Sequence, residues 1–163
     1  MTNPRFKQTA GKAIRTVLLG WLIAGTLDIC AACTQYFINT GKGPQNVLRF
    51  VASGYFGKEA LSGGWEMAAW GLLFHFIIAF VITLVFFLIY PWLKKWIGNI
   101  PLMAIGIGLA AWTVMNLIVV PNSNTPPIHR TTLSILIAMG ILIVCIGLPL
   151  AVVMARYYRK QRT

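Results

Sequence analysis

Residues 67–93 read MAAWGLLFHFIIAFVITLVFFLIYPWL and contain no Asp, Glu, Lys or Arg. A helix needs about 20 apolar residues to cross about 30 Å of hydrocarbon, so this stretch is long enough to span a membrane. Inside a bilayer each backbone polar group must be paired within the protein, which favours a helix. We therefore predict a membrane-spanning helix over residues 65–90.

Three other stretches have the same character. Residues 96–129 and 131–155 also lack all four charged residue types, and residues 16–41 contain only Asp28. These stretches predict three more spans, over residues 14–38, 101–120 and 131–156. The fold class that follows is an all-α membrane protein, a bundle of four transmembrane helices in one domain over residues 1–163.

The link between the first two spans, residues 39–64, is long for a segment without structure of its own. Pro44 suits the first turn of a helix, and apolar residues follow it. We therefore predict a short helix in this loop, lying on the outer face of the membrane.

The composition agrees with a membrane protein. Hydrophobic residues make up 58% of the chain and charged residues 10%, and the mean hydropathy is +0.74. A soluble domain has about 25% charged residues. The chain has too few charges to cover a water-exposed surface, which excludes a soluble enzyme, a disordered tail and a disulfide-rich secreted module. The lipid bilayer is therefore its expected partner.

The positive charges are unevenly placed. The net charge is +11, and ten cations fall before the first span, between the second and third, or after the fourth: Arg5, Lys7, Lys12, Arg15, Lys94, Lys95, Arg156, Arg159, Lys160 and Arg162. Only Lys42, Arg49, Lys58 and Arg130 fall in the other two loops. The positive-inside rule then predicts that both termini are cytoplasmic. This placement explains the basic composition, so we expect no nucleic-acid partner.

Short motifs follow one another along residues 20–123: Gly25-Thr26-Leu27-Asp28, Gly43-Pro44, Val51-Ala52-Ser53-Gly54, Gly63-Gly64, His75-Phe76, and Met115-Asn116 with Pro121. This ordered series resembles a family of small four-span bacterial inner-membrane proteins with no assigned activity. The resemblance implies the bacterial inner (cytoplasmic) membrane and a four-helix architecture. It carries over no catalytic or binding residue.

Asp28 and His75 are the polar residues that stand out inside the spans. Both lie about 15 Å below the outer boundary at 1.5 Å per residue, on adjacent antiparallel helices. A carboxylate within a span is costly unless it is paired, and it usually faces the bundle interior. Asp28 and His75 could thus form a proton-handling or ligand-binding pair, and Asn116 in the third span could complete it. The alternative is that all three serve only as hydrogen-bonding groups between helices.

Two other kinds of site are weaker hypotheses. Cys30 and Cys33 form a C-x-x-C pair, but dithiol chemistry in a membrane normally needs a second pair, and only Cys145 remains. His75 and His129 are expected at different depths, which does not suit a haem with two histidine ligands. We therefore expect no cofactor and no metal.

These residues favour a small transporter or ligand-binding bundle that uses an intramembrane Asp/His cluster, and we do not expect an enzyme. A non-catalytic accessory subunit of a larger membrane complex is the alternative, and a membrane thiol redox protein comes third. A homo-oligomer is compatible with either of the first two.

Overall fold

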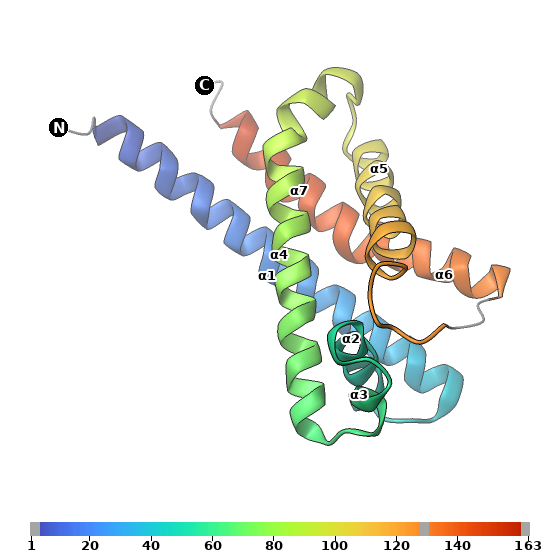
Figure 1. The fold of residues 1–163 in the computed structure, drawn as a ribbon. Coiled ribbons are helices and arrows are strands. Elements are labelled where there is room, and N and C mark those ends of the chain that lie inside the picture. The colour runs from blue at the N-terminus through green and yellow to red at the C-terminus, as the bar shows by residue number, and fades with distance from the viewer. Residues whose placement is uncertain (1–3, 128–130, 161–163) are drawn as a thin grey trace.

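The computed structural model describes residues 4–127 and 131–160, and these ranges are helical without a strand (Figure 1). In chain order the elements are α1 (Pro4–Thr40), α2 (Gln45–Phe56), α3 (Glu59–Ser62), α4 (Trp65–Trp96), α5 (Ile100–Thr113), the π-helical η1 (Val114–Val119), α6 (Thr132–Leu142), the π-helical η2 (Ile143–Gly147) and α7 (Leu148–Arg159).

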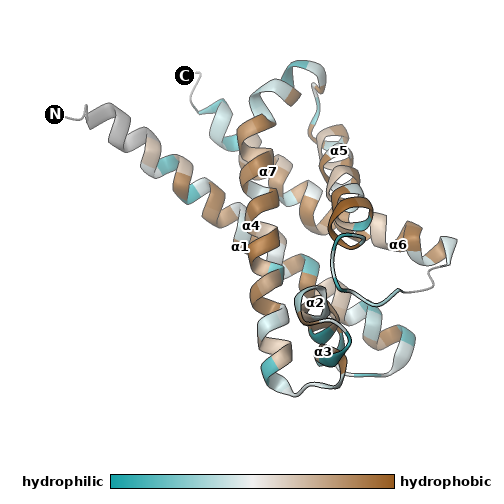
Figure 2. Cartoon of the chain, viewed as in Figure 1, coloured by the Kyte–Doolittle hydropathy of each residue, from teal (hydrophilic) through white to brown (hydrophobic). Residues whose placement is uncertain are grey.

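The described residues contain four helices that are long and apolar enough to cross a membrane. They are Ala10–Thr40, Trp65–Trp96, Ile100–Val119 and Thr132–Arg159. Apolar residues dominate the long helices, and polar residues gather towards their ends and in the links (Figure 2). The all-α, four-span fold class is confirmed, including a short helix, α2, between the first two spans. The structure thus supports a multi-pass membrane protein.

The links fall at two ends of the molecule. The chain ends and the α4–α5 link lie at one end, and α2 and α3 lie at the other (Figure 1). We call the first the cationic end, because it carries Lys12, Arg15, Lys94, Arg156 and Arg159, and the second the α2 end. Arg130 and Arg162 lie outside the described residues, as do the side chains of Arg5 and Lys7.

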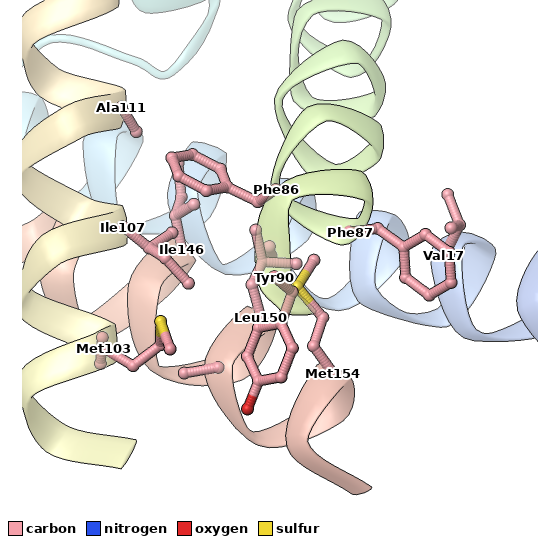
Figure 3. Close-up of a cluster of buried hydrophobic side chains, with 13 residues drawn as sticks. Val17, Phe86, Phe87, Tyr90, Met103, Ile107, Ala111, Ile146, Leu150 and Met154 are labelled. Atoms are coloured by element: carbon pink, nitrogen blue, oxygen red, sulfur yellow. The ribbon is translucent and has the colours of Figure 1, made fainter. Parts of the chain in front are cut away.

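The core lies in the half of the molecule nearer the cationic end. Figure 3 shows Phe86 and Tyr90 of α4 facing Ile107 of α5 and Leu150 of α7. Leu150 has no exposed surface, and Ile107 is also fully buried. This packing fixes α4, α5 and α7 relative to one another. The first span, α1, packs against α4 and α7.

Two glycines allow α5 and η2 to touch backbone to backbone. A methyl group on Gly147 would overlap the carbonyl oxygen of Ala104, and one on Gly108 would overlap the Cα of Ile143. Close helix contact through small residues is the usual way in which membrane helices associate, because lipid offers little hydrophobic drive. The third and fourth spans are therefore in direct backbone contact at η2, the π-helical segment of the fourth span.

The second span runs further than the sequence predicts. The predicted span ends at residue 90, but α4 continues through Pro91 to Trp96. Proline has no N–H to donate to the carbonyl four residues earlier, which here belongs to Phe87. The hydroxyl of Tyr158 in α7 donates to that oxygen at 2.8 Å, and the Tyr158 ring stacks on Tyr90 at 5.2 Å. A neighbouring helix thus supplies the bond that Pro91 cannot make.

The short helix α2 packs directly on α4. A side chain on Gly71 would overlap the carbonyl of Leu48, and Ala52 and Ser53 of α2 are fully buried. The link before α6 also holds α2, because the backbone N–H of Asn124 donates to Gly54 at 3.0 Å. The helix expected to lie on the surface is therefore an integral part of the fold at the α2 end.

Candidate functional site

The centre of the α1–α4 contact is held by two side chains that donate in opposite directions. The indole N–H of Trp21 in α1 donates to the carbonyl oxygen of Phe76 in α4 at 2.7 Å. In return the His75 ring of α4 bonds the carbonyl oxygen of Gly25 in α1 at 2.9 Å through Nε2. A methyl group on Gly25 would lie 3.0 Å from the Phe76 ring, so a glycine at this position allows the close approach.

The bond to Gly25 determines how His75 can act. A carbonyl oxygen only accepts hydrogen bonds, so Nε2 must carry a proton. The other ring nitrogen, Nδ1, takes no part in this bond. His75 is half-buried, and its ring packs edge-on against Phe76 with 5.4 Å between centroids. The imidazole is therefore held in one orientation.

Asp28 lies one helical turn beyond Gly25 and is half-buried. Its carboxyl is close enough to His75 for their charges to interact. The hydrogen bond of the His75 ring nevertheless goes to the Gly25 carbonyl. The structure thus brings the two predicted site residues together as electrostatic neighbours. Such a pair can hold a proton, or can hold a cation beside the carboxylate.

A pocket that we call the polar pocket, after the amide and hydroxyl groups in its wall, opens at the α2 end. Its volume is about 730 Å³, and α1 lines it with Ala32, Gln35, Tyr36, Asn39 and Thr40. Ala32, the α1 lining residue nearest to Asp28, lies one turn after it along the helix. Asn46 of α2 and Ser134 of α6 face the same space. The pocket therefore offers amide and hydroxyl groups to a ligand, beside apolar walls formed by Val47, Phe50 and Leu61.

Asn116 lies in a different place. Its side-chain amide donates to the Trp112 carbonyl of the same helix at 2.9 Å. It lines a separate cavity of about 420 Å³ beneath the proline-rich link, together with Ser123 and Thr125. Neither Asp28 nor His75 lines that cavity. The structure thus brings together two of the three predicted site residues and places the third elsewhere.

The cysteines are all free thiols in the structure. The Cys33 thiol points to the Pro44 carbonyl at 3.9 Å, where α1 meets the start of α2. Cys145 in η2 is close enough to Asp28 and Cys30 for their charges to interact. Cys145 comes near Asp28 because η2 packs against α1.

Two other titratable residues remain to be placed, Glu66 and His129. Glu66 is exposed in the first turn of α4. His129, which the haem hypothesis needed, lies outside the described residues. Within the described ranges, no group of three or more His, Cys, Asp or Glu side chains is arranged to hold a metal ion.

Sequence reasoning missed the polar pocket, although a signal for it existed. Gln35 and Asn39 are spaced by four residues, as are Tyr36 and Thr40, which places polar groups on a shared face of one helix. The partner of the Trp21 indole had no comparable signal, because a backbone carbonyl has no sequence signature. Comparison with protein-family models, with curated proteins and with solved structures finds no match for this chain, and the family resemblance therefore stays a prediction.

Proposed function

We propose that this membrane protein is a small transporter or ligand-binding bundle in which Asp28 and His75 handle a proton while a polar ligand occupies the polar pocket. One observation carries the proposal. The imidazole of His75 is fixed on the Gly25 carbonyl through Nε2, and the carboxyl of Asp28 is close enough for the two charges to interact. Ionisable groups inside membrane spans are costly and mark proton or ion pathways by default.

The polar pocket favours the transporter hypothesis over the hypothesis of an accessory subunit. An accessory subunit that uses Asp28 only for packing would not need an open pocket through which a ligand could enter from the membrane surface. Here Gln35, Asn39 and Asn46 line an open space whose α1 wall includes Ala32, four residues after Asp28 in the chain. No charged side chain lines it, so the ligand class that it suits best is a small polar molecule that is neutral or carries one positive charge.

Asp28→Asn in the full chain tests the role of the pair. The purified protein would be reconstituted in liposomes that contain a pH-sensitive dye, and small amines, amino acids and sugars would be added outside in turn. We expect at least one compound to move protons with the wild type and the Asn variant to fall to the rate of empty liposomes. The His75 bond to Gly25 does not need the carboxyl, so unfolding free energy should change by less than about 1 kcal/mol.

Glu66→Gln is the matched control, because it removes a carboxylate from the exposed first turn of α4. It should leave proton movement intact. If no compound moves protons with the wild type, the transporter reading is wrong. If Asp28→Asn is as active as the wild type, transport stands and the role of Asp28 is wrong. An accessory subunit would show neither activity nor sensitivity.

We also propose that the chain lies in a bacterial inner membrane with the cationic end in the cytoplasm. The accumulation of Lys and Arg at that end supports this orientation. Gly64→Cys and Gly98→Cys test it in a background without the three native cysteines, because an added side chain meets nothing within 4 Å at either site. An impermeant maleimide should label Gly64→Cys in intact cells and Gly98→Cys only in permeabilised cells. The reverse pattern would overturn the orientation.

A further inference from the structure

A groove of about 790 Å³ lies between α1 and α7 at the cationic end. Its outer part is lined by Lys12 and Arg15 from α1 and by Arg156 and Lys160 from α7. Both helices reach this end beside the two chain termini (Figure 1). Four cationic side chains from two spans therefore converge on one space.

The deeper part of the same groove is apolar. Leu19 and Ile23 continue the face of α1 that carries Arg15, because residues three and four apart share one side of a helix. Val153 does the same on α7 below Arg156. Leu19 and Ile23 are both exposed in the isolated chain. Both walls thus change from apolar to cationic in the same direction, over about 12 Å from Ile23 to Arg15.

No carboxylate side chain of this protein can neutralise the groove. The chain has three acidic residues, Asp28, Glu59 and Glu66. Asp28 is 13 residues beyond Arg15 in α1, or about 20 Å along the helix. Glu59 and Glu66 belong to α3 and α4 at the α2 end. The side-chain carboxylates of the protein are therefore all far from Lys12, Arg15 and Arg156, and a bound anion would complement these three cations.

We propose that this groove binds one anionic phospholipid, with its phosphate on Lys12, Arg15 and Arg156 and an acyl chain along Leu19, Ile23 and Val153. A phospholipid has the same order of parts as the groove walls, with a negative headgroup above an apolar tail. Basic pockets between transmembrane helices are suited to lipid headgroups. The site lies at the opposite end from the polar pocket, so it does not depend on the proposed transport activity.

The test uses the purified full chain in neutral detergent, titrated with phosphatidylglycerol, with phosphatidylcholine, or with inorganic phosphate and glycerol 3-phosphate. Bound lipid is measured by native mass spectrometry and by the shift in the thermal unfolding midpoint. Phosphatidylglycerol should bind one per chain and raise the midpoint. Phosphatidylcholine and the two soluble phosphates should not. Equal binding of phosphatidylcholine would overturn the charge argument, and a shift with soluble phosphate would show a phosphate site in place of a lipid site.

The double variant Arg15→Gln, Arg156→Gln should weaken phosphatidylglycerol binding about 30-fold, since each Lys or Arg near an anionic lipid contributes about 1 kcal/mol. Lys94→Gln, Lys95→Gln is the matched control, because it removes two charges from the same end outside this groove. It should weaken binding no more than about threefold on the same scale. Equal weakening by both would show general attraction to a basic surface, and would overturn the site. If the Arg variant does not fold, the wild-type comparison of the three ligands still decides.

Discussion

The Gly147→Ala variant is expected to unfold with a free energy at least about 1–3 kcal/mol below that of the wild type, the usual range for overpacking a tight contact. The added methyl would overlap the Ala104 carbonyl oxygen and lie 2.9 Å from its carbon. It would also lie 3.1 Å from the backbone nitrogen of Gly108. These neighbours are backbone atoms of α5, so no side chain can rotate away, and the two helices must separate. Unfolding of the purified protein in mixed detergent micelles would measure the change.

Gly140→Ala is the matched control for this experiment. Gly140 lies in α6, in the same span, and a methyl group there meets nothing within 4 Å. Alanine favours a helix over glycine by up to about 1 kcal/mol, so this variant should be unchanged or more stable. If both variants lose the same stability, the loss comes from the glycines themselves, and the close contact of α5 with η2 is wrong.

The second large effect is expected at Tyr158. Tyr158→Phe keeps the ring that stacks on Tyr90 but removes the hydroxyl that donates to the Phe87 carbonyl. Pro91 cannot donate to that oxygen, so the Phe87 carbonyl oxygen would lose the Tyr158 bond with no replacement from Pro91. We expect a loss of about 0.6–2 kcal/mol in unfolding free energy, the range for hydrogen bonds between membrane helices. Tyr157→Phe removes a hydroxyl from the next residue and leaves this bond in place, so it serves as the control.

A double-mutant cycle with Pro91→Ala gives the sharper test. Alanine at position 91 restores an N–H that can bond the Phe87 carbonyl within α4. In that background Tyr158→Phe should cost clearly less than it does in the wild type. The difference between the two costs measures the coupling. Additive effects would mean that Tyr158 does not replace the bond that Pro91 lacks.

The sequence predicted the two polar residues of the site better than it predicted their bonds. Asp28 and His75 were paired from depth alone, because 1.5 Å per residue places them at one level on neighbouring helices. Depth does not give the rotation of a helix about its own axis. That rotation decides that the His75 ring donates to Gly25 and that Asn116 belongs to a different cavity.

The sequence by itself determined the four spans, the short helix between the first two, and the end at which the cations gather. These properties depend on residues that are close in the chain, since a helix crosses a membrane if enough consecutive residues are apolar. Only the tertiary structure decided that Tyr158 replaces the bond that Pro91 lacks, that α1, α2 and α6 line one pocket, and that cations of the first and last spans line one groove. Each of these joins residues far apart in the chain. They follow from helix crossings set by glycine contacts and core packing, which no local pattern encodes.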